Sequence, residues 1–137
     1  MNYFLDANIF VRHIAKDHKV LSPKAKMIFE KVATKEVRVS VTTLVLHEAI
    51  YVLEHIYKVG RKNIVENIVK PIALEGFRIL DLDKMRVLAA LDDFVNTKLD
   101  FADCVYKQVA LENKLKILSF DRDFSKLKVK RLETVWM

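Results

Sequence analysis

Apolar residues along the chain form short extended runs, separated by longer segments with helical spacing. The short runs are Asn2 to Leu5, Val37 to Val41, Phe77 to Leu82 and Leu115 to Phe120, with a candidate edge strand at Leu132 to Trp136. Their apolar, β-branched character is typical of strands in a covered sheet. We therefore expect four or five short strands.

The segments between these strands carry apolar residues at i, i+3, i+4 and i+7, which is the pattern of amphipathic helices. The expected helices cover residues 22–35, 42–58, 61–74, 84–97 and 100–113. Ser22 and Pro23 suit a helix start as cap and first residue, and Thr42 or Thr43 suits another. Gly60 is expected to end the long helix, and Pro71 to bend or end the next. Strands alternating with helices predict a three-layer α/β domain with a mainly parallel sheet.

Length and composition agree with one globular domain. The chain has 137 residues, of which 52% are hydrophobic and 31% charged, without a repeat or a flexible linker. Only two glycines and two prolines are present, which argues against a β-sandwich with a turn at every corner. We expect a single domain spanning residues 1–137.

Several features favour a cytoplasmic protein without a membrane segment. No apolar stretch approaches the ~20 residues of a membrane span, and Asp6 and Arg12 interrupt any N-terminal signal. The single cysteine, Cys104, forms no internal disulfide and is expected to be a small buried residue. We expect four phenylalanines to lie in the core or an interface, namely Phe10, Phe29, Phe94 and Phe101. Three histidines have no cysteine or histidine partner at zinc spacing, namely His13, His18 and His55.

The charge balance points to a polyanionic partner. The chain has 24 Lys and Arg against 18 Asp and Glu, a formal net charge of +6. A basic surface attracts nucleic acid, although lysine-rich surfaces also serve solubility.

Four acidic residues are placed where an open α/β sheet binds its ligands, beyond the carboxyl ends of its strands. Asp6 and Asp121 each end a predicted strand, Asp103 lies in the first turn of a helix, and Glu48 lies about one turn inside another. Each also has a structural interpretation. Asp6 could cap a helix, and Asp121 could form an Asx-turn or a cap. Asp103 could interact with the helix dipole, in a helix that Asp100 caps. Glu48 could lie at the rim or pair with a lysine.

Together the four carboxylates predict a metal centre. We expect Glu48 in particular to be covered, because its helix is apolar on both faces, and a buried carboxylate requires a cation or donors. Clustered carboxylates repel each other unless a divalent cation neutralises them, and oxygen-only ligands suit Mg²⁺ or Mn²⁺ rather than zinc. The net charge of +6 includes these four acids, so the rest of the molecule is more basic still.

The blocks around these acids resemble the PIN-domain family. They are the opening Met-Asn-Tyr-Phe-Leu-Asp-Ala-Asn-Ile-Phe, then Thr-Leu-Val-Leu-His-Glu, Asp-Phe-Ala-Asp and Ser-Phe-Asp-Arg-Asp-Phe, in family order across the chain. The resemblance is strongest to the VapC-like group, prokaryotic ribonucleases that act as toxins of type II toxin–antitoxin pairs. It implies a Rossmann-like α/β/α sandwich and metal-dependent endonucleolytic cleavage of RNA.

The resemblance also implies residue roles. The four family acids fall on Asp6, Glu48, Asp103 and Asp121, which would bind one or two Mg²⁺ or Mn²⁺ ions that activate water, with no side-chain nucleophile. The expected supporting polar residues are Asn8, Thr43, Ser119 and Asp123. Cys104 replaces the alanine that usually follows the third acid, and Asp100 remains an alternative ligand. The basic residues expected near the mouth of the site are Arg12, Lys16 and Arg122, whereas His47 points away from Glu48 and is expected to pack.

Partners and alternatives follow from the same resemblance. Relatives form homodimers and are inhibited by a small antitoxin, and the apolar helical positions from Val45 to Ala73 suit such surfaces. An RNA-processing nuclease without an antitoxin and a non-catalytic RNA-binding module remain alternatives. A haloacid dehalogenase-like phosphatase is disfavoured, because its motif needs a second acid where Asn8 stands.

Overall fold

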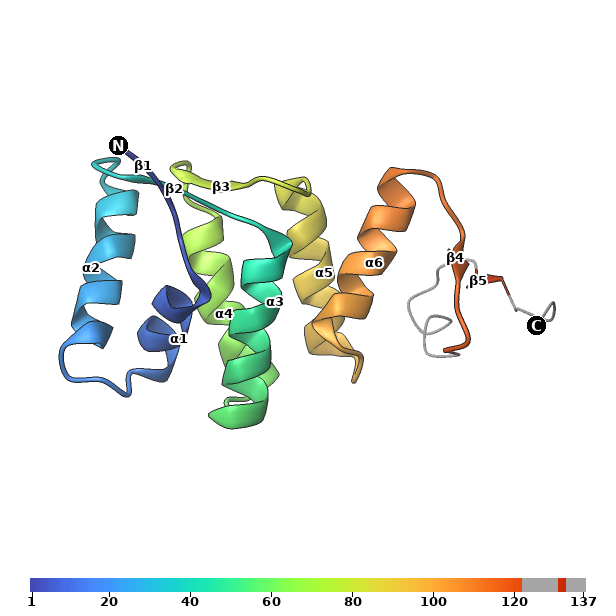
Figure 1. Cartoon of the computed structure of the whole chain (residues 1–137), viewed down its shortest axis with the longest axis horizontal. Coiled ribbons are helices and arrows are strands. Elements are labelled where there is room, and N and C mark those ends of the chain that lie inside the picture. The colour runs from blue at the N-terminus through green and yellow to red at the C-terminus, as the bar shows by residue number, and fades with distance from the viewer. Residues whose placement is uncertain (122–130, 133–137) are drawn as a thin grey trace. The chain divides into compact units, whose positions relative to one another are not determined.

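The chain divides into two compact units, residues 1–84 and residues 85–137. The structure, a computed structural model, describes residues 1–121 and 131–132 (Figure 1).

The N-terminal unit is built on a three-stranded parallel sheet with the order β1-β2-β3. The strands are β1 (Asn2–Phe4), β2 (Arg38–Val41) and β3 (Phe77–Ile79). Val39 and Val41 pair with Phe77 and Ile79, and all four side chains are buried, whereas Arg38 and Arg78 on the opposite face are exposed. Because successive residues of a strand face opposite sides, this alternation gives the sheet one buried face.

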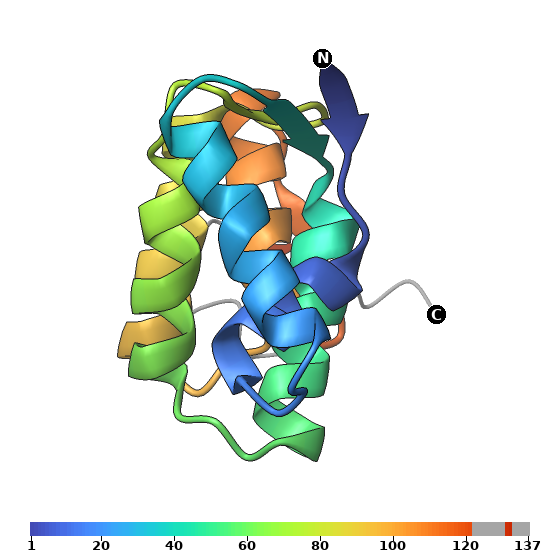
Figure 2. The same cartoon turned by 90° about the vertical axis from the view of Figure 1, so that its left-hand side faces the viewer.

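Five helical segments accompany this sheet. They are α1 (Ala7–Ala15), α2 (Leu21–Ala33), α3 (Thr43–Tyr51), the π-helical turn η1 (Val52–Ile56) and α4 (Arg61–Ile72). Helix α1 packs against α2 and α3, and Figure 2 shows α2 and α4 side by side beneath the strands. Phe10 of α1 is fully buried, with its ring 5.4 Å from that of Phe29 and 5.9 Å from that of Phe77. These rings join α1, α2 and the sheet into one core.

Among its described residues, the C-terminal unit has two helices and a short parallel strand pair. Helix α5 (Lys84–Asn96) begins at the last residue of the first unit and is followed by α6 (Phe101–Glu112). Strand β4 (Ile117–Leu118) pairs with β5 (Arg131–Leu132). The rings of Phe94 and Phe101 meet edge to face at 6.1 Å and are buried. All four phenylalanines expected in the core or an interface are buried, and so is Cys104.

Most of the predicted elements are present, with shorter strands. Helix α1 was not among the expected helices, and the long helix ends at Ile56, so Gly60 instead occupies the N-cap position of α4. Of the candidate edge strand at Leu132 to Trp136, only Leu132 lies among the described residues. The expected start of α2 at Ser22 was wrong, because the helix begins at Leu21 and Ser22 lies in its first turn. The Nδ1 atom of His18 instead accepts hydrogen bonds from the backbone N–H groups of Val20 and Leu21, at 3.2 and 2.9 Å. The predicted long helix over 42–58 begins as expected, with the Thr42 side chain accepting from Val45, but continues beyond Tyr51 as a π-helical turn.

Lysines take the left-handed backbone conformation at four helix ends. The residues are Lys16, Lys35, Lys58 and Lys114, with φ values of 54°, 66°, 57° and 55°. Glycine usually fills such positions, but this chain has only two glycines. Within the described residues, no helix is long and apolar enough to cross a membrane.

Candidate active site

Asp6 stands between β1 and α1, at the carboxyl end of the first strand. Its backbone occupies the N-cap position of α1, but its side chain makes no capping hydrogen bond. The carboxylate is exposed and has no hydrogen bond or ion pair within the part of the chain that the structure describes. The capping interpretation of Asp6 is therefore not supported, and its oxygens remain available for a ligand. Asn8, in the first turn of α1, is exposed as well.

Glu48 lies near the middle of α3 and is exposed. The expectation that it would be covered was wrong, because the same face of α3 also exposes Leu44 (71%) and Tyr51 (55%). The apolar residues that cover this helix, Val45 and Leu46 among them, lie on its other side. The Glu48 carboxylate likewise has no hydrogen bond or ion pair among the described residues, so no lysine neutralises it.

Thr43, a predicted supporting residue, is held by an acid that the sequence did not single out. Asp81 accepts hydrogen bonds from the Thr43 backbone N–H at 2.9 Å and from the Thr43 hydroxyl at 2.6 Å. Asp81 follows β3 just as Asp6 follows β1, so both lie at the carboxyl edge of the sheet. The strand expected from the sequence reached Leu82, so Asp81 fell inside it, whereas the structure ends β3 at Ile79 and leaves Asp81 at the edge where ligands bind.

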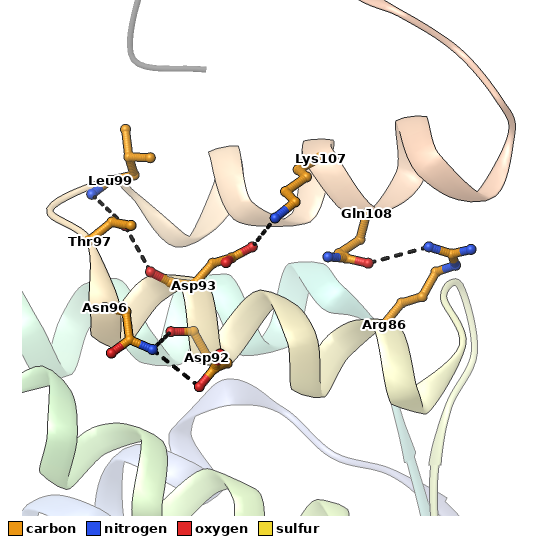
Figure 3. Close-up of polar contacts among 8 residues, drawn as sticks. All are labelled: Arg86, Asp92, Asp93, Asn96, Thr97, Leu99, Lys107 and Gln108. Atoms are coloured by element: carbon orange, nitrogen blue, oxygen red, sulfur yellow. Dashed lines mark hydrogen bonds and ion pairs between the residues drawn. The ribbon is translucent and has the colours of Figure 1, made fainter. Parts of the chain in front are cut away.

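Asp103 lies in the first turn of α6, where the helix dipole favours an anion. Asp100 occupies the N-cap position of α6, but its side chain makes no capping hydrogen bond, so the expected cap is not formed. Helix α6 is fixed to α5 by polar contacts shown in Figure 3. Lys107 forms a part-buried ion pair with Asp93 at 2.9 Å, and Arg86 donates to Gln108 at 3.4 Å.

Asp121 follows β4 and is exposed. The hydroxyl oxygen of Ser119 accepts a hydrogen bond from the Asp121 backbone N–H at 2.9 Å. Ser119, a predicted supporting residue, therefore fixes the turn from which Asp121 projects. Asp123 and Arg122, the other two residues assigned to this segment, lie outside the described residues.

Within the N-terminal unit, the structure brings Asp6 to the same sheet edge as the start of the helix that carries Glu48. The backbone N–H of Leu5 donates to Ser40 of β2, two residues before the Thr42 cap of α3. Asp103 and Asp121 belong to the other unit. Among residues 1–121 and 131–132, no three histidine, cysteine or acidic side chains form a group able to hold a metal ion.

The donor chemistry of these residues nevertheless fits Mg²⁺ or Mn²⁺. Asp6 and Glu48 offer unpartnered carboxylate oxygens, and hard divalent cations prefer oxygen ligands. A carboxylate that only capped a helix or balanced a lysine would already have its partner. The residues present are thus compatible with a divalent cation.

Two of the basic residues expected at the mouth of the site, Arg12 and Lys16, lie toward or beyond the far end of α1. The Arg12 guanidinium is 2.8 Å from the Asp17 carboxylate, and Lys16 follows the last residue of α1. Because α1 has nine residues, it is about 13 Å long, and it carries Lys16 to the end remote from Asp6. His47 is half-buried, with its ring 6.5 Å from Tyr51, in line with a packing role.

Comparison with known proteins identifies the family. The model of the PIN domain family matches residues 3–130. The chain belongs to the PIN domain family. This membership confirms the expected fold class, a Rossmann-like α/β/α sandwich on a mainly parallel sheet, and PIN domains are generally nucleases.

Comparison with solved structures adds a likeness to the crystal structure of VapBC2 from Rickettsia felis bound to a DNA fragment from their promoter. The likeness covers 96% of this chain and 98% of that one, at 16% sequence identity and a TM-score of 0.33. No curated protein matches the chain significantly.

Proposed function

We propose that this protein is a cytoplasmic, Mg²⁺- or Mn²⁺-dependent endoribonuclease of the VapC-like kind, acting as the toxin of a type II toxin–antitoxin pair. Residues 1–137 form its single nuclease domain. Asp6, Glu48, Asp103 and Asp121 bind the metal and are the catalytic residues, with Asn8, Thr43, Ser119 and Asp123 supporting them. RNA is the substrate.

The observation that carries this proposal is the position of two unpartnered acids, which follow adjacent parallel strands of a basic chain. Asp6 and Glu48 have no cation or donor among the described residues, although the chain carries an excess of lysine and arginine. Exposed acids such as Glu66 have no partner in the described part of the chain either, so the distinguishing feature is position: Asp6 follows β1, and Glu48 lies on the helix that follows β2. Their place at the carboxyl edge of a parallel sheet is where open α/β folds bind ligands.

The proposed role of each residue follows from its chemistry. When bound, the divalent cation lowers the pKa of a water and stabilises charge on the phosphate. Asp6, Glu48, Asp103 and Asp121 supply its oxygen ligands. Asp81 orients Thr43 at the start of the helix that carries Glu48, and Ser119 fixes the backbone at Asp121. The chain needs no side-chain nucleophile.

Cleavage of an end-labelled structured RNA tests the proposal. We expect endonucleolytic products with Mn²⁺ or Mg²⁺ and none with EDTA. Asp6→Asn and Glu48→Gln should each lower the rate by at least about 100-fold, because each removes a charged group from the site. Glu66→Gln, which removes an exposed acid from α4, is the matched control and should cleave normally.

The metal can be tested separately from cleavage. Titration with Mn²⁺, followed by the relaxation of water protons, should show binding that weakens in Asp6→Asn and Glu48→Gln. Metal-independent cleavage, or full activity of Asp6→Asn, would refute the assigned site. Intact RNA together with undiminished metal binding in both variants would refute the nuclease proposal altogether.

The partners are a second copy of the chain and a small antitoxin protein. Leu44, Tyr51 and Ile56 expose large apolar side chains on α3 and η1, which suits an interface. Sedimentation of the pure protein should show a dimer. Expression of the wild-type protein, but not of Asp6→Asn, should arrest growth, and growth should recover when a neighbouring antitoxin gene is expressed. A cleaving but harmless protein would instead favour RNA processing without an antitoxin.

A further inference from the structure

A cavity lies in the N-terminal unit, remote from Asp6. It has a volume of about 610 Å³ and is formed by the end of α1, the loop that follows it, the start of α2 and Asn67 of α4. In Figure 1 the α1–α2 loop lies at the end of α1 away from β1. Its lining includes the polar residues His13, Lys16, His18, Lys19, Ser22 and Lys26.

Positive charge dominates the lining of this cavity. Lys16 and Lys19 have no acidic partner among the described residues, and Lys26 has only a long contact of 4.0 Å with Glu30 between exposed side chains. The one acidic lining residue, Asp17, already accepts hydrogen bonds from the Arg12 guanidinium at 2.8 Å and the Tyr57 hydroxyl at 2.7 Å. The lysines are therefore left without a counter-charge inside the cavity.

The hydrogen bonds at the start of α2 leave donors for a ligand. Because the His18 Nδ1 accepts from two backbone N–H groups, the proton of the neutral ring is on Nε2, which remains a donor. The Ser22 oxygen accepts from the His18 backbone N–H at 3.2 Å, so the Ser22 hydroxyl proton is also available. The cavity thus presents cations and donors whose acceptors are missing among the described residues.

The pKa of His13 is affected by the same positive charges. Burial and the nearby Lys16 and Lys26 lower the pKa of the half-buried His13, while Glu30 opposes them. The His13 ring lies 4.7 Å from the Phe29 ring, so it has little freedom to turn away. An anion in the cavity would oppose the lysines and raise the pKa of His13, which gives the site a spectroscopic signature.

We propose that this cavity binds a backbone phosphate of the RNA substrate, away from the bond that is cleaved. The inference rests on the proposed ribonuclease function and adds to it a second contact with the same strand. A phosphate offers several acceptor oxygens and a negative charge, which matches three lysines and two neutral donors. The length of α1, about 13 Å, separates the cavity from Asp6, so the contact positions the strand without touching the reacting atoms.

Binding of a labelled single-stranded RNA, in EDTA to prevent cleavage, tests this proposal on the full-length protein. The variant Lys16→Gln/Lys19→Gln should lose about tenfold in affinity and lower the slope of log K against log salt by about 0.7 per contact. The matched control, Lys62→Gln/Lys70→Gln, removes two exposed charges from α4 and should bind nearly as the wild type does. Circular dichroism confirms that both variants are folded.

Titration with inorganic phosphate, followed by the imidazole signals of His13 and His18, supplies an independent measurement. We expect both signals to shift in the wild type and not in the Lys16→Gln/Lys19→Gln variant. Equal loss of RNA affinity in both double variants would overturn the proposal, since the loss of net positive charge alone would then explain the weaker binding. Phosphate binding without any effect of the cavity variant on RNA affinity would assign the cavity to a free anion and overturn the RNA contact.

Failure of this inference is distinguishable from failure of the proposed function. If the wild-type protein cleaves RNA with metal and the cavity variant binds RNA normally, only the phosphate contact in the cavity is refuted. Wild-type protein that binds no RNA refutes both.

Discussion

The Asp81 carboxylate accepts two hydrogen bonds from Thr43, one from its backbone N–H at 2.9 Å and one from its hydroxyl at 2.6 Å. Thirty-eight residues separate the two in sequence. The pair ties the end of β3 to the first residue of α3, and α3 also carries Glu48. The direction of α3 at the carboxyl edge of the sheet therefore depends on a residue that is not among the four proposed metal ligands.

Asp81→Asn should weaken catalysis more than it weakens folding. The amide loses the negative charge that both Thr43 donors favour, which should cost about 1 kcal/mol of stability, as for other helix-start contacts. A small displacement of α3 moves Glu48, and kcat should fall by up to about 100-fold with little change in KM. Urea denaturation and RNA cleavage kinetics measure the two effects, with Glu66→Gln as control. Lower stability with unchanged kcat would show that Asp81 only anchors the helix.

The sequence predicts the order of elements and the strand-end acids better than it predicts their surroundings. Asp6 and Asp121 follow apolar runs short enough to be strands, so their location was readable. The exposure of Glu48 could not be predicted, because α3 is apolar on both sides. Which side remains exposed depends on which surface of α3 packs against α1. The hydrogen bonds between the start of α2 and His18 were missed for a similar reason, since they require the His18 ring to turn toward the backbone of Val20 and Leu21.

The helix ends were also difficult to predict, because lysine stands where glycine is usual. Lys58 has φ 57° after η1, a conformation that costs an L-residue roughly 1–2 kcal/mol. Lys58→Gly should raise the free energy of unfolding by about 0.5–1 kcal/mol, since glycine relieves this cost but loses more entropy on folding. Lys58→Ala, which removes the same side chain and keeps the strain, should not be stabilising. Equal stability of the two variants in urea would contradict this explanation.

The lowered pKa of His13 predicts a specific dependence on pH. In the unfolded chain the imidazole takes up a proton near its ordinary pKa of 6.5, whereas burial and the charges of Lys16 and Lys26 oppose that proton in the fold. Folding stability should therefore fall as the pH decreases from about 6.5 to the lower pKa of the folded state, and then level off. His13→Gln should make the stability less dependent on pH across this range.

Lys16→Gln provides a direct check of the cause. Removal of the neighbouring charge should raise the pKa of His13 measured by NMR, while Lys70→Gln on α4 should leave it where it is in the wild type. A His13 pKa unaffected by Lys16→Gln would assign the shift to burial and Lys26.

The contact between Tyr57 and Asp17 predicts a stabilising effect confined to a window of pH. The Tyr57 hydroxyl donates to Asp17 at 2.7 Å, which lowers the pKa of Asp17, with further help from Arg12, and raises the pKa of Tyr57. The Asp17 contribution is present above the unfolded pKa of 3.8 and is lost as the pH falls through the lower folded value. The Tyr57 contribution is present below the unfolded pKa of 10.0 and is lost as the pH rises through the higher folded value.

Tyr57→Phe should therefore be least stable relative to the wild type between about pH 4 and pH 10, and the difference should shrink at both extremes. Urea denaturation across this pH range measures the difference, with Tyr106→Phe, at an exposed position of α6, as control. A difference that is constant with pH would mean that the Tyr57 ring stabilises the fold by packing and not through its bond to the carboxylate.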